Sequence, residues 1–227
     1  MLRIIGSFAI IFGIVIGLTA FSSPKTFSSE MLKIQDPTTI GKDQIKQWIQ
    51  QQSKKKDHYF EHLTFQTTNL DDDDALEVVA TLTGGVHIGS FFLFDKQENG
   101  QYQLLTEQPW KIEKLDLEQP ITYLHGKKLY QTVHRTGGTG VSVEIAVLWF
   151  MDKGQLVEAW SGTLKETSTF QDEYYAQLGS YHIFEENLHY FTTTYKRSVD
   201  DTKTPSFFKQ ASSTFTFNGT IFESLIN

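Results

Sequence analysis

The sequence contains no cysteine and only three arginines among its 227 residues. The absence of cysteine excludes a disulfide framework, a thiolate nucleophile, a cysteine-bound zinc ion and a lipid-modified cysteine. The shortage of arginine, together with a net charge of -7, argues against nucleic acid as a partner, because phosphate backbones are bound by clustered basic side chains. The G-x-S-x-G, H-E-x-x-H and Walker motifs are also missing. The sequence therefore offers no catalytic motif on which to base an enzyme.

The clearest feature of the sequence is an uncharged segment near the amino terminus. Residues 4–21 carry no charge and follow Arg3, and a helix of that length would be about 27 Å long, close to the roughly 30 Å of a bilayer core. Ala20 and Ser22 supply the small residues that a signal peptidase requires for a cut before Ser23. We therefore expect residues 1–22 to be either a signal peptide or a membrane anchor. The positive charge before the segment places the rest of the chain outside the cytoplasm.

Residues 23–57 are predicted to form a linker that contains one short helix. Serine, threonine and proline are frequent at the start of this stretch, and they favour solvated turns over packing. Ile45, Trp48 and Ile49 follow at helical spacing, so a helix over about 41–53 would have one narrow apolar face.

Residues 58–227 are predicted to be a β-rich extracytoplasmic domain. Segments of alternating apolar and polar residues recur with turn residues between them, such as Asn99-Gly100 and Asn218-Gly219, and this pattern is typical of hairpins. The expected fold is an antiparallel all-β meander, arranged as a sandwich or as a small propeller-like structure. The predicted hairpins pair residues 90–94 with 101–105, 123–124 with 129–130, 143–151 with 155–160, 181–184 with 188–192, and 213–217 with 220–223.

An acidic loop precedes one of these strands. Oxygen-bearing groups recur at alternate positions from Asn69 onwards, a pattern that suits Ca²⁺, which takes six to eight oxygen ligands. The loop departs from an EF-hand because Asp74 stands at the usual glycine position and Ala80 at the position of the bidentate glutamate. The alternative is a solvated acidic turn without an ion. The candidate ligands are the side chains of Asn69, Asp71, Asp73 and Glu77 and the carbonyl of Ala75.

The stretch NLDDDDALEVVATLTGG resembles the signature of FG-GAP, or integrin-α N-terminal, repeats. In that signature a D-x-D-x-D-G loop leads into an acidic and then hydrophobic strand. The resemblance covers residues 69–94 and implies a propeller-like β fold with an optional Ca²⁺ loop. The order of apolar leader, linker helix, acidic loop and aromatic hairpins also resembles exported, membrane-associated proteins of Gram-positive, Bacillus-like bacteria.

Two further groups of residues were considered as binding sites. Glycine-rich backbone beside basic side chains can hold an anion, and this pattern occurs at His134, Arg135, Gly137, Gly138 and Gly140; a wide turn between two strands is the alternative. His58 and His62 would share one face if the first helix extended that far, but a zinc ion would need further ligands.

We expect an exported, membrane-tethered, β-rich binding or interaction protein. Its partners would be the membrane, contacted through the amino-terminal helix, and a ligand of the cell envelope or the extracellular space, with no nucleic acid. The alternative is an extracytoplasmic hydrolase whose carboxylates are dispersed along the chain and meet only in the folded protein.

Overall fold

A computed structural model of the chain describes residues 40–71, 73–85, 88–112, 115–201 and 203–225. The proposed leader, residues 1–22, and most of the proposed linker lie outside these ranges. Within them, no helix combines the length and the apolar character needed to cross a membrane. The described residues belong to one compact unit that begins at Ile40, so the predicted helix is part of this unit.

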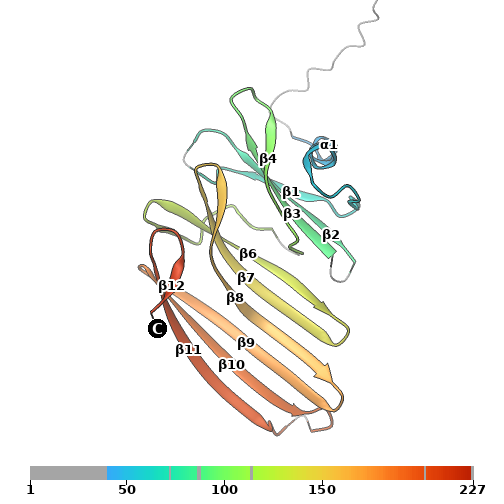
Figure 1. Cartoon of the computed structure of the whole chain (residues 1–227), viewed down its shortest axis with the longest axis vertical. Helices are drawn as coiled ribbons and strands as arrows, with labels where there is room; N and C mark the ends of the chain where they lie inside the picture. The colour runs from blue at the N-terminus through green and yellow to red at the C-terminus, as the bar shows by residue number, and fades with distance from the viewer. Residues whose placement is uncertain (1–39, 72, 86–87, 113–114, 202, 226–227) are drawn as a thin grey trace, which may run out of the picture. The chain divides into compact units, whose positions relative to one another are not determined.

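The amino-terminal part of the unit is a helix on a four-stranded antiparallel sheet (Figure 1). The strands follow one another in chain order, as expected for a meander. Ile45 and Ile49 on the helix are fully buried against the sheet, which confirms the predicted apolar stripe. The elements are α1 (Lys42–Gln52), β1 (Thr64–Thr68), β2 (Glu77–Gly84), β3 (Ile88–Lys96) and β4 (Tyr102–Gln108).

The carboxyl-terminal part is an eight-stranded antiparallel sheet, again with its strands in chain order. Two register shifts interrupt the pairing of β7 with β8, and bulges of this kind bend a strand and increase its twist. The strands are β5 (Thr122–Leu124), β6 (Lys127–Gly138), β7 (Val141–Asp152), β8 (Gln155–Phe170), β9 (Glu173–Phe184), β10 (Asn187–Ser198), β11 (Phe207–Phe217) and β12 (Phe222–Ser224).

The two sheets pack face to face. Val79 and Leu93 of the first sheet share one apolar cluster with Val147 and Trp149 of the second. Strand β2 is therefore covered by α1 on one side and by the second sheet on the other, and its first six residues are all buried. This explains why β2 carries apolar residues on both faces, at Val78, Val79, Ala80 and Leu82, instead of on alternate positions only.

A second apolar cluster covers the opposite face of the eight-stranded sheet. It contains Leu124 from β5 and Phe222 from β12, so side chains from the first and last strands of the sheet share one core. Aromatic side chains pack closely against strand glycines here, and a Cβ at Gly162 would be 2.2 Å from the Trp160 ring. A Cβ at Gly179 would likewise come within 2.8 Å of the Tyr190 hydroxyl oxygen.

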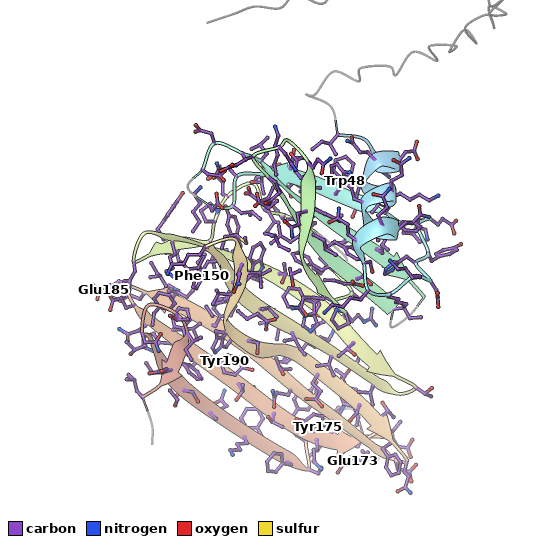
Figure 2. All side chains as sticks on the ribbon, turned by 45° about the horizontal axis from the view of Figure 1, so that its top comes forward. Trp48, Phe150, Glu173, Tyr175, Glu185 and Tyr190 are labelled. Carbon is purple, nitrogen blue, oxygen red and sulfur yellow. The ribbon has the colours of Figure 1, made fainter. Side chains whose placement is uncertain are left out.

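The far ends of strands β8 to β11 lie outside both clusters. In Figure 2, Glu173 and Tyr175 mark this end of β9, while Glu185 and Phe150 lie towards the opposite end of the sheet. Phe170 and Phe208 are exposed there, at 75% and 58%.

The five predicted hairpins and the single short helix are confirmed among the described residues. The fold is mostly antiparallel β, but no closed propeller is seen in the described ranges; the arrangement is two packed meanders.

Candidate metal centre

The predicted acidic loop connects β1 to β2 and brings three carboxylates together. One ligand oxygen each from Asp71, Asp73 and Glu77 lies within 4.8 Å of the others. This is the one group of at least three acidic, histidine or cysteine side chains with metal-binding spacing among the described residues.

Short-range hydrogen bonds from the loop backbone hold the Asp71 and Asp73 side chains. The Asp73 backbone N–H donates to Oδ1 of Asp71 at 3.0 Å, and the Ala75 backbone N–H donates to Oδ1 of Asp73 at 2.7 Å. Bonds of this kind, from a backbone N–H to an aspartate two residues earlier, define Asx-turns. In each aspartate, Oδ1 accepts the hydrogen bond of the turn, and the second carboxylate oxygen, Oδ2, takes no part in that bond.

Glu77 is the buried member of the group. It begins β2, its exposed fraction is 0%, and Oε2 accepts a hydrogen bond from the Leu70 backbone N–H at 2.5 Å. Its other oxygen, Oε1, is buried and has no hydrogen-bond partner among the described residues. Burial, and then the charges of Asp71 and Asp73, raise the pKa of Glu77 to about 7. An unpaired carboxylate in this position is costly unless a proton or a cation neutralises it.

A fourth carboxylate, Asp95, comes from β3 and was not a sequence candidate. Val78 pairs with Phe94, so continuing that register sets Glu77 opposite Asp95 across the two strands. Oδ1 of Asp95 is also buried without a hydrogen-bond partner in the described part of the chain. Burial, and then the charges of Asp73 and Asp71, raise the pKa of Asp95. The negative charges of the loop therefore act on Asp95, a residue more than 20 positions further along the chain than Asp73.

Strand β6 holds the outer side of the loop. The Lys128 ammonium donates to Oδ1 of Asn69 at 2.5 Å and to the Asp71 carbonyl, and the Tyr130 hydroxyl donates to the Asn69 carbonyl at 3.2 Å. Lys128 thus adds one positive charge beside the cluster, but it contacts neutral oxygens and leaves the two orphaned carboxylate oxygens without a partner.

The sequence candidates for the metal therefore divide into two groups. Asp71, Asp73 and Glu77 converge as expected. Asn69 uses its Oδ1 to accept from Lys128 and its Nδ2 to donate to the Asp73 carbonyl, whereas Ala75 takes part through its backbone N–H. Asp72 lies outside the described residues.

The glycine-rich segment differs from the expected loop. His134, Arg135, Gly137 and Gly138 belong to β6, and Gly140 lies in the tight turn into β7. The glycines allow close packing, since a Cβ at Gly137 would lie 2.3 Å from the Val141 carbonyl oxygen and one at Gly140 would lie 2.9 Å from that of Thr169.

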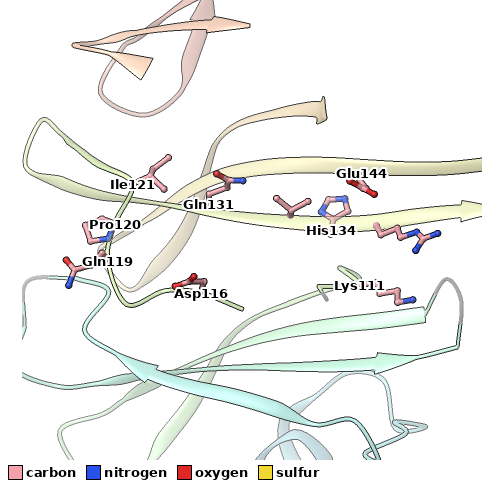
Figure 3. Close-up of a pocket in the computed structure, with 10 residues that line it drawn as sticks. Lys111, Asp116, Gln119, Pro120, Ile121, Gln131, His134 and Glu144 are labelled. Carbon is pink, nitrogen blue, oxygen red and sulfur yellow. The ribbon is translucent and has the colours of Figure 1, made fainter. Parts of the chain in front are cut away.

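His134 and Arg135 instead line a cavity of about 560 Å³ beside β6, with Lys111, Asp116 and Glu144 among its other walls (Figure 3). The His134 ring stacks on Trp110 at 5.6 Å, and burial lowers its pKa. A neutral imidazole contributes no positive charge, so this cavity lacks one of the two charges expected to attract an anion.

The two histidines considered for zinc do not share a helix face, because α1 ends at Gln52. His58 Nε2 instead lies 2.7 Å from the Ser53 hydroxyl, which also lies 2.9 Å from Glu107 Oε2. A nucleophilic triad needs the imidazole between the hydroxyl and the carboxylate, whereas here the hydroxyl is in the middle. This cluster joins the end of α1 to β4.

No protein-family model, curated protein or solved structure matches this chain. The function has to be inferred from the site itself.

Proposed function

We propose that this protein is an exported, membrane-tethered binding protein whose β-rich domain binds Ca²⁺ at Asp71, Asp73 and Glu77. The observation that carries the proposal is the fully buried Glu77, which lies beside two further carboxylates and whose Oε1 has no hydrogen-bond partner within the described part of the chain. A Ca²⁺ ion supplies the missing charge and accepts the irregular oxygen geometry that a loop of this kind offers. The export and the tether rest on the apolar pattern of residues 4–21.

The expected affinity is low and suits the space outside the cell. Position twelve of the loop is Ala80, so the bidentate ligand of an EF-hand is missing, although Asp95 adds negative charge nearby. Extracellular Ca²⁺ modules have dissociation constants of about 10⁻⁴ to 10⁻³ M, and we expect a value in that range.

The test is a thermal melt of the full-length chain in mild detergent, with 5 mM Ca²⁺ or with chelator. An ion that binds only the folded state raises the melting temperature, here by about 3–5 °C for a domain of this size. Asp73→Asn should abolish most of this increase.

Asp74→Asn is the matched control, because Asp74 is exposed and lies in the same loop but outside the converging group. It removes the same charge and should leave the Ca²⁺ response intact. Equal melting temperatures of the unsubstituted chain in Ca²⁺ and in chelator would show that the loop is only an acidic turn.

The hydrolase alternative has less support. Glu77 has the pKa of a general acid, about 7, but a catalytic acid must reach the substrate, and Glu77 is completely covered. The geometry fits ion binding better than proton transfer.

A further inference from the structure

A cavity of about 580 Å³ opens directly beside the acidic loop. Asp71 and Asp73 form one wall. His125 and Lys153 line the cavity from two hairpin turns, and Lys127 and Lys128 line it from the start of β6. Its volume is within the range of small-molecule sites. The cavity therefore joins the proposed ion site to a group of basic side chains.

The two turns that carry the basic side chains have the same backbone form. His125 and Gly126 connect β5 to β6 with φ angles of 49° and 78°, and Lys153 and Gly154 connect β7 to β8 with φ angles of 51° and 71°. Two successive residues with positive φ are typical of the tight type I′ hairpin. The basic side chains therefore start from short, well-defined turns, or from the strand directly after one, rather than from a long loop.

The basic and acidic side chains of the cavity do not neutralise one another completely. Lys127 lies 3.3 Å from Asp152, and Lys128 donates to Asn69 and to the Asp71 carbonyl. Among the described residues, Lys153 is exposed and forms no ion pair. None of these ion pairs engages the carboxylates of Asp71 or Asp73. The cavity therefore presents carboxylates that can bind a cation on one side and lysine side chains that can bind an anion on the other.

We infer that this cavity binds a phosphate group, which completes the coordination of the Ca²⁺ ion held by Asp71 and Asp73 and is neutralised by the lysines, Lys153 above all. The inference rests on the proposed Ca²⁺ site. Ca²⁺ needs more oxygens than the loop provides and readily takes them from a ligand. Lysine ammonium groups bind phosphate as point charges. The cavity lining contains no arginine, so lysine ammonium groups would supply the positive charge.

The test uses glycerol phosphate as the probe, titrated calorimetrically into the full-length chain in mild detergent with 2 mM Ca²⁺ or with chelator. Binding should require Ca²⁺, and Lys153→Gln should weaken it at least fivefold while the Ca²⁺-dependent increase in melting temperature stays unchanged. Lys203→Gln, which removes an exposed lysine outside the cavity lining, should bind glycerol phosphate as the unsubstituted chain does.

A second titration, with dihexanoyl phosphatidic acid below its micelle concentration, identifies the source of the phosphate. At least tenfold tighter binding than that of glycerol phosphate would assign the site to a lipid headgroup, and equal binding would assign it to a free phosphate ester. Either result supports the inference.

The failure of this inference is distinct from that of the proposed function. If Ca²⁺ raises the melting temperature but glycerol phosphate does not bind, or binds equally well in chelator, the phosphate site is wrong and the Ca²⁺ site stands. If Ca²⁺ has no effect on the melt, both are wrong.

Discussion

At the scale of single residues, Glu77 determines how the acidic loop behaves. It begins a strand that is buried on both faces. One of its carboxylate oxygens accepts a hydrogen bond from the Leu70 backbone, the other has no hydrogen-bond partner among the described residues, and the carboxylates of Asp71 and Asp73 lie close by. Without an ion, the folded protein can relieve this cost by taking up a proton. The same residue therefore couples folding both to pH and to metal binding.

This coupling predicts an unusual pH dependence. The pKa of Glu77 is about 7 in the folded chain against an ordinary value of 4.5, so between these values the folded state holds more protons than the unfolded state. In chelator, the contribution of Glu77 to the free energy of unfolding is complete below pH 4.5 and is lost as the pH rises to about 7. The difference between the two pKa values corresponds to about 3 kcal/mol.

Glu77→Gln should remove this loss, since the amide does not titrate, and should make the chain more stable than the unsubstituted protein at pH 8 in chelator. Denaturant unfolding at several pH values measures the effect. Asp74→Asn serves as the control and should leave the pH profile almost unchanged. A profile that is the same for Glu77→Gln and the unsubstituted chain would show that another group titrates.

At the scale of elements, the helix and the strand it covers depend on each other. Ile45 and Ile49 contact the face of the first sheet that is turned away from the second sheet. Trp48 stacks on Tyr102 of β4 with ring centres 4.6 Å apart. Because α1 has only 11 residues, its stability comes from this packing rather than from its own hydrogen bonds.

Removing one buried side chain from α1 should therefore destabilise the whole unit. Ile49→Ala leaves a cavity in the apolar cluster and should lower the free energy of unfolding by about 2–5 kcal/mol. Gln47→Ala, on the exposed side of the same helix, should change it by less than about 0.5 kcal/mol. Denaturant melts of both variants measure these values, and equal losses would mean that α1 does not depend on its apolar face.

Strand β2 was predicted from the sequence although it does not follow the alternating pattern of the hairpins near the carboxyl terminus. Alternation of apolar and polar residues predicts a strand with one face exposed to solvent. Both faces of β2 are buried, and its first six residues are all covered. The turn residues on its flanks and the acidic loop before it still indicated where it begins.

At the scale of the whole molecule, the eight-stranded sheet extends beyond its covered region. Strands β8 and β11 carry exposed aromatic side chains at this far end, namely Phe170, Phe207 and Phe208. The acidic loop and its neighbouring cavity lie where the two sheets meet. An exported chain would present both regions outside the cytoplasm. That orientation depends on residues 1–22, which lie outside the described ranges.

We expect the protein to fractionate with membranes or with the cell exterior, because residues 4–21 are uncharged and follow Arg3. Mass spectrometry of the amino terminus distinguishes the two cases: a chain that starts at Ser23 has been secreted by cleavage, and one that starts at Met1 is anchored. Recovery of the full-length chain from the cytosol would contradict the prediction.

The sequence by itself determined those features that depend on neighbouring residues. Helical spacing located α1, Asn99-Gly100 located the turn between β3 and β4, and the alternating oxygens located the acidic loop. Turn chemistry and side-chain periodicity act over a few residues, so they can be recognised without knowledge of the fold.

Only the tertiary structure decided what surrounds the loop. The register of β2 and β3 sets Asp95 opposite Glu77, and Lys128 reaches Asn69 across 59 positions of the chain. The burial that raises the pKa of Glu77 comes from packing one sheet on another. Such contacts depend on how distant segments are arranged in space. The local sequence around a residue does not determine which distant residue it contacts.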